Sequence, residues 1–122
     1  MSTNKQEDYS DLHSITEAKA RDILESLPEQ SSIDSQSEIF RALSEPTRVK
    51  ILYLLSNEEM CVHDLTTLIN SSQSSVSHHL KILKLNNLVE ARREGKAVYY
   101  SLVDQHVSSL FSQCLEHVEH EE

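Results

Sequence analysis

Apolar residues recur every three or four positions along most of the chain, a spacing that predicts helices. The first helix is expected over residues 16–27, where a proline closes it, and the next over residues 35–43, with residues 29–33 as a linker. Residues 1–14 are polar and lack this periodicity. They are expected to form a flexible acidic arm ahead of one folded domain that covers residues 15–122.

A strongly apolar helix and a pair of short helices follow. The apolar helix begins at residues 44–46, where Ser44 is the expected cap and a proline fits the first turn. Its interior, residues 49–55, predicts the central helix of the core. Residues 61–69 and 73–86 each carry one apolar stripe and are separated by a short polar break. Two helices joined by such a turn are the outline of a helix-turn-helix.

The periodicity then changes to that of strands. Residues 88–92 and 97–102 are β-prone runs, and the chain's single glycine lies between them, where a tight turn needs a positive φ. The expected fold class is therefore mostly α with a small β-hairpin, a winged helix-turn-helix. A last amphipathic helix opens at Asp104. Its apolar surface exceeds what one small domain covers, which predicts a homodimer through the N- and C-terminal helices.

Composition and charge narrow the class of protein. One Gly and two Pro among 122 residues disfavour a sandwich or barrel, and no apolar run is long enough to span a bilayer. No signal peptide is visible, and Cys61 and Cys114 lack the spacing of a disulfide framework, which fits a cytoplasmic protein. Cys114, in the middle of a helix, is expected in the core. The net charge of −9 conceals a basic block, because residues 72–100 hold five basic and two acidic residues.

The basic block and the helix-turn-helix together predict binding to double-stranded operator DNA. The second helix of the pair would present polar side chains to base edges, and the hairpin would grip the backbone or minor groove. The expected DNA-contacting residues are Gln73, Ser74, Ser75, Ser77, His78 and Lys81 on the helix and Arg92, Arg93 and Lys96 on the hairpin. The alternative is that the serines only cap the helix and that the basic residues form a solvated hairpin.

Four residues of metal-ligand type lie near the C-terminus: Asp104, His106, His117 and His120. On a helix, His106 and His117 would lie roughly 16 Å apart, too far for one metal ion, yet residues 106, 117 and 120 share one face. An antiparallel second copy would bring residues 104 and 106 of one subunit to residues 117 and 120 of the other, giving two symmetric sites. The alternative is that Asp104 is a helix cap and that the histidines are solvated.

Four motifs of this chain occur together in one known family. They are Ala42-Leu43-Ser44-Glu45-Pro46-Thr47-Arg48, Met60-Cys61-Val62-His63-Asp64-Leu65, Ser74-Ser75-Val76-Ser77-His78-His79-Leu80 and Gly95-Lys96-Ala97-Val98-Tyr99-Tyr100-Ser101-Leu102. Over about residues 35–120 the chain resembles the ArsR/SmtB metal-sensing repressors. The resemblance implies a homodimeric repressor that metal releases from its operator, which derepresses genes for metal efflux or sequestration. It also implies that the four C-terminal ligands form the family's zinc-type site.

The second metal site of that family departs here from its cysteine-rich form. Members that respond to arsenic, cadmium or lead carry Cys-Val-Cys-Asp, whereas this chain has Cys-Val-His-Asp at residues 61–64. Thiophilic metals lose most of their advantage when only one thiolate remains. Cys61 and Asp64, with Asp11 or His13 from the partner's arm, are a candidate second site. The alternative is that Cys61 packs in the protein and that Asp64 favours a helix N-terminus.

One carboxylate and three imidazoles suit tetrahedral Zn²⁺, with Co²⁺ as a substitute, whereas Ni²⁺ prefers more ligands and would need a donor such as His13. The expected function is a metal-responsive transcriptional repressor with no small-molecule substrate. An enzyme is disfavoured because four protein ligands leave no open coordination position. The alternatives left open are a winged-helix regulator without metal input, one that responds to oxidation of Cys61, and a protein-interaction module.

Overall fold

The computed structural model describes residues 14–120, in two compact units that divide between Ser35 and Gln36. In the first unit, α2 covers Glu17–Glu25, and the Thr16 hydroxyl caps it by accepting the backbone N–H of Lys19 at 3.2 Å. This helix confirms the helix predicted over residues 16–27. The predicted arm, apart from Ser14, lies outside the described residues.

The predicted linker over residues 29–33 is wrong, because α3 runs over Gln30–Ala42. The serines of this segment suggested a loop, but no Gly or Pro interrupts the chain here. The backbone N–H of Ile33 bonds to the carbonyl of Glu29 at 3.1 Å, and the Gln30 amide donates to the Asp34 carboxylate at 2.9 Å. These bonds start the helix about one turn earlier than the apolar pattern indicates.

The central helix of the second unit, α4, covers Pro46–Leu55, and its cap differs from the prediction. The Glu45 carboxylate caps α4 by accepting the backbone N–H groups of Thr47 at 2.7 Å and Arg48 at 3.1 Å. The hydroxyl of Ser44, the predicted cap, instead donates to the carbonyl of Arg41 at 2.7 Å. Ser44 thus lies just past the end of α3 and bonds to its last turn.

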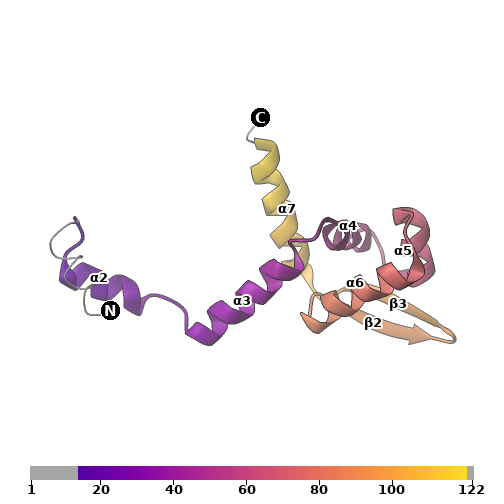
Figure 1. The fold of residues 1–122 in the computed structure, drawn as a ribbon, viewed down its shortest axis with the longest axis horizontal. Helices are drawn as coiled ribbons and strands as arrows, with labels where there is room; N and C mark the ends of the chain where they lie inside the picture. Colours follow the sequence, from indigo (N-terminus) through magenta and orange to yellow (C-terminus); the bar gives the residue numbers. More distant parts are fainter. Residues whose placement is uncertain (1–13, 121–122) are drawn as a thin grey trace. The chain divides into compact units, whose positions relative to one another are not determined.

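The helix-turn-helix has the predicted form (Figure 1). Helix α5 covers Val62–Ile69 and ends at Asn70, whose left-handed backbone (φ 61°) reverses the chain. Helix α6 covers Gln73–Leu85 and is capped by Ser72, whose hydroxyl accepts the backbone N–H of Ser75 at 3.1 Å. Because these caps leave only three residues between the helices, α5 and α6 are held at a fixed angle.

The predicted hairpin is present and gains a third strand. Strands β2 (Val89–Glu94) and β3 (Ala97–Leu102) pair antiparallel around Gly95, whose φ of +64° explains the glycine. The two-residue strand β1 (Met60–Cys61) pairs with the other edge of β3, in the order β1-β3-β2. Such a short strand leaves no period-two pattern to detect. It ties the start of α5 to the hairpin.

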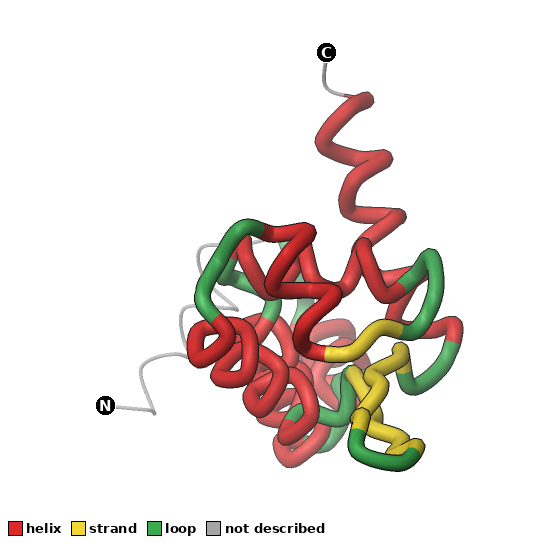
Figure 2. Tube along the Cα trace, turned by 90° about the vertical axis from the view of Figure 1, so that its right-hand side faces the viewer, coloured by secondary structure: helices red, strands yellow, loops and turns green. Residues whose placement is uncertain are grey.

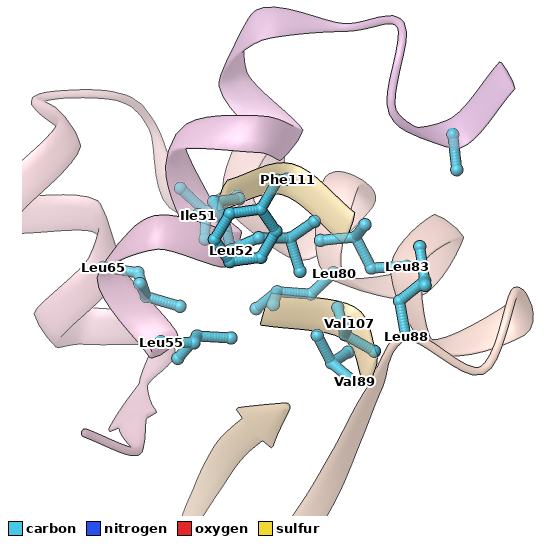
Figure 3. Packing of buried hydrophobic residues seen from close by; sticks show 12 residues of the cluster. Ile51, Leu52, Leu55, Leu65, Leu80, Leu83, Leu88, Val89, Val107 and Phe111 are labelled. Atoms are coloured by element: carbon cyan, nitrogen blue, oxygen red, sulfur yellow. The ribbon is translucent and has the colours of Figure 1, made fainter. Parts of the chain in front are cut away.

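One apolar core joins the hairpin to helices α4, α5 and α6 and to the first half of α7, which covers Gln105–His120 (Figure 3). The predicted inward residues of α6 are buried, and so are two residues of α7. The core residues are Ala42, Ile51, Leu52, Leu55, Leu65, Val76, Leu80, Leu83, Leu88, Val89, Val107 and Phe111. This packing fixes the outward face of α6.

The second half of α7 extends beyond this core (Figure 2). Past Phe111, residues 112–120 are all exposed in the single chain. Cys114 is therefore exposed, and its predicted place in the core is wrong. The amphipathic pattern identified its apolar neighbours correctly, but within the described chain no element covers this part of the helix. Among residues 14–120, no helix is long and apolar enough to cross a bilayer.

Candidate functional site

The outward face of α6 carries the residues predicted to contact DNA. Because the apolar stripe turns toward the core, Gln73, Ser77 and His78 are exposed, as are Ser74 and Lys81. Ser75 is half-buried, and its backbone N–H is used by the helix cap. The face offers amide, hydroxyl, imidazole and ammonium groups, which are the groups that read base edges and phosphates.

The three basic residues predicted on the hairpin are all exposed, and Arg92 also has partners within the chain. The Arg92 guanidinium bonds to the carboxylates of Glu59 and, at 2.9 Å, of Glu94, and it lies 5.2 Å from the centre of the Tyr99 ring. The hydrogen bonds that Arg92 donates to Glu59 and to Glu94 raise its pKa above the usual value. Arg92 therefore links the hairpin to Glu59, and Arg93 and Lys96 are exposed beside it on the hairpin.

The predicted metal ligands fall into two pairs at opposite ends of α7. The Asp104 carboxylate accepts the backbone N–H of His106 at 2.9 Å, and the same oxygen lies 3.3 Å from the His106 ring Nδ1. The side chain of His106 is 97% exposed, and that of Asp104 is 50% exposed. His117 and His120 lie exposed in the last turns of the helix. The structure thus brings together residues 104 and 106, and it places residues 117 and 120 far along the helix.

Within residues 14–120 of one chain, no group of three or more His, Cys, Asp or Glu side chains could hold a metal ion. Any four-ligand site built from the α7 residues therefore requires a second chain. Asp104 has the capping role that was its alternative interpretation, but capping uses only one of its two carboxylate oxygens. Capping and metal ligation by Asp104 are compatible.

An apolar groove of about 460 Å³ runs along α7, and we call it the α7 groove. Its wall includes the edge-on contact of Tyr53 with Phe111, whose ring centres lie 4.5 Å apart. Exposed apolar side chains line it, at 60% for Phe40, 42% for Leu110 and 55% for Val118. The lining residues are Phe40, Leu43, Val49, Tyr53, Leu110, Phe111, Cys114, Leu115 and Val118. Contiguous exposed apolar surfaces of this size commonly mark interaction surfaces.

The candidate second metal site is only partly described. The Asp64 carboxylate accepts the backbone N–H of Cys61 at 3.3 Å, so Asp64 supports the start of α5 as its alternative interpretation proposed. Cys61 is half-buried. Asp11 and His13 lie outside the described residues. Sequence reasoning did not anticipate the open pocket beside this site, which is lined by Glu58, Met60, His63, Asp64, Thr67 and Leu68.

Comparison with known proteins identifies the family. The profile described as "Bacterial regulatory protein, arsR family" matches residues 45–91. A cadmium resistance transcriptional regulatory protein CadC homolog of Staphylococcus aureus is 42% identical over 111 residues, which span 90% of this chain and 91% of the relative. This chain belongs to the ArsR family. A transcriptional repressor SmtB homolog of Synechocystis is 41% identical to this ArsR-family chain over 95 residues, 75% of this chain and 72% of the relative.

Solved structures confirm the winged helix-turn-helix of this ArsR-family chain. The homodimeric winged helix-turn-helix DNA-binding domain from Mycobacterium bovis has a TM-score of 0.70 at 29% identity, covering 77% of this chain and 89% of that one. Apo-NmtR has a TM-score of 0.64 at 38% identity, covering 78% and 81%. The relatives are transcriptional regulators and not enzymes, in agreement with the prediction. The α5–α6 pair and the hairpin are thus the helix-turn-helix and the wing of an ArsR-family fold.

Proposed function

We propose that the protein is a metal-responsive repressor whose metal-free dimer binds operator DNA and is released when Zn²⁺, or Co²⁺ in its place, binds between the C-terminal helices. The ligands are Asp104 and His106 of one subunit with His117 and His120 of the other. Release derepresses genes for metal efflux or sequestration. Membership of the family supports repression by this chain. The identity of the metal, its ligands and the release from the operator are what we propose.

The observation that carries the proposal is that the α7 groove spans Leu110 to Val118 on α7, between His106 and His120. At 100° per residue, Leu110 and Cys114 fall within about 80° of His106 around the helix. One edge of the apolar stripe, at Leu110 and Cys114, therefore adjoins the histidines, whereas Leu115 lies about 180° from His106. A partner that covers this edge also approaches the histidines. In an antiparallel copy of α7, the start of one helix meets the end of the other.

The donor set fits zinc. Neutral imidazoles and a carboxylate are borderline and hard ligands that suit four-coordinate Zn²⁺, whereas cadmium favours thiolates. The chain has only two cysteines, one at the cap of α5 and one on α7. Residues 101–122 also carry five acidic and no Lys or Arg residues, so two such helices repel each other. A bound divalent cation would join the two chains and offset that repulsion.

The link to DNA follows from the position of α7 in the fold. Val107 and Phe111 anchor α7 in the same core as α6, so the angle between two α7 helices affects the separation of the two α6 helices. Recognition helices must enter successive major grooves about 34 Å apart. A metal that fixes an unsuitable angle weakens operator binding, and a coupling of about 1–3 kcal/mol is typical of allostery.

Metal titration tests the ligand set. We expect metal-free protein to bind one Zn²⁺ per chain at the α7 site, with an affinity that falls with decreasing pH, because protons compete with the metal for its ligands. Isothermal calorimetry at several pH values measures this. A Co²⁺ complex should give the visible spectrum of a tetrahedral site. Zinc binding that persists unchanged when His117 and His120 are both replaced by alanine would contradict the assignment.

A further inference from the structure

Two consecutive histidines of α6 face opposite ways. His78 is exposed on the outward face of α6, which we call the reading face because it carries the predicted DNA contacts. The His79 side chain is only 13% exposed and turns toward α4. The guanidinium of Arg48 lies 3.2 Å from the His79 ring through Nη1 and Nδ1. Arg48 also donates through Nε to the carbonyl of Ala42, at 2.7 Å. Through Arg48, His79 is joined to the last residue of α3.

The contacts determine which ring nitrogen of His79 carries the proton. Arg48 is always a donor, so it can bond only to an Nδ1 that has no proton. The neutral ring then carries its proton on Nε2, which lies 3.9 Å from the carboxylate of Glu45. Glu45 is held in place because it caps α4. The contact with Arg48 therefore requires the neutral form of His79.

We infer that neutral His79 is a positioning residue for operator binding, which joins α6 to the α3–α4 junction through Arg48 and so holds the reading face of α6 at the angle that DNA requires. Val76, Leu80 and Leu83 also hold α6, but apolar contacts are not directional and tolerate small rotations. A hydrogen bond to a charged donor has a defined direction and is among the stronger kind. The inference rests on the proposed operator binding.

Protonation of His79 would remove this contact. The charged and titratable groups around the ring are Arg48 and Glu45 from α4 and its cap, and His78 on its own helix. Burial lowers the pKa of His79 below its usual value, Arg48 and His78 act in the same direction, and Glu45 opposes them. The ring is therefore neutral near pH 7. As the pH falls below about 6.5 toward this lowered pKa, Nδ1 gains a proton and faces Arg48 as a second donor.

Two variants separate this role from simple packing. His79→Gln supplies an amide whose oxygen can accept from Arg48 and whose N–H can face Glu45, and it does not titrate. His79→Leu keeps an apolar side chain of similar size and removes both polar atoms. Affinity for a fluorescein-labelled inverted-repeat duplex from upstream of the protein's own gene is measured with chelator present, from about pH 7.5 to 5.5. The wild type and His79→Gln both retain His78. The ratio of their dissociation constants therefore cancels any effect of His78 on the pH dependence of DNA binding.

We expect His79→Gln to match the wild type within about twofold at the higher pH and to bind about fivefold more tightly than the wild type at the lower one. His79→Leu should lose about tenfold in affinity at the higher pH while circular dichroism and sedimentation show a folded dimer. A constant ratio of wild type to His79→Gln across the pH range overturns the inference, whatever His79→Leu does. Failure of the wild type to bind the duplex at any pH would instead contradict the proposed operator binding.

Discussion

Replacing His106 with alanine is expected to abolish the release of operator DNA by zinc while the metal-free protein still binds the operator. The side chain of His106 is 97% exposed, so its loss should cost the fold little. It removes one of four proposed ligands, and the dimer then loses a coupling that typically changes affinity about 5- to 150-fold. Operator affinity with and without zinc, measured for both proteins, checks the prediction.

His63→Ala is the matched control for His106→Ala. His63 is also an exposed histidine, but it lies on α5 beside the pocket near Cys61. Its replacement should leave release by zinc intact if the α7 ligands carry the response. If zinc failed to release the His63→Ala protein from the operator but still released His106→Ala, the zinc response would depend on the α5 region. That result would contradict the proposed ligand set.

Leu115→Glu is expected to convert the dimer into monomers and to weaken operator binding strongly. Leu115 is 40% exposed in the single chain and lines the α7 groove, so a partner would bury the introduced carboxylate without a counter-charge. Two linked DNA-binding units bind roughly 10²- to 10⁴-fold more tightly than one, and a monomer loses most of this gain in affinity. Sedimentation velocity and operator titration measure both effects.

Leu68→Glu provides the control for the change in oligomeric state. Leu68 is 58% exposed, which is more than Leu115, but it lies on α5 outside the α7 groove. The Leu68→Glu protein should remain dimeric at the same concentration. If Leu115→Glu also sediments as a dimer, the α7 groove is not the interface and the shared metal site loses its structural basis.

Features set by neighbouring residues were predictable from the sequence. The stripe of Val76, Leu80 and Leu83 identified both the buried and the exposed face of α6, and Gly95 marked the turn of the hairpin. The errors arose where local signals compete. Serines suggested a linker at residues 29–33 and a helix cap at Ser44. The linker residues instead belong largely to α3, and Glu45 caps α4.

Contacts between distant parts of the chain were not predictable. Arg92 bonds to Glu59, which is 33 residues away. Arg48 and His79 are 31 residues apart, and no spacing rule joins them. The proposed metal ligands are harder still to group from the sequence, because they lie on two chains. Asp104 and His106 adjoin within one chain, but their proposed partners belong to another molecule.

The most direct test of the account is operator binding by the wild-type protein, with and without one equivalent of Zn²⁺ per chain. Fluorescence anisotropy of the labelled inverted-repeat duplex measures both states at one salt concentration, because affinity for DNA depends steeply on salt. We expect tight binding by the metal-free dimer and a loss of affinity of about tenfold or more with zinc. Tight binding that zinc leaves unchanged would contradict it.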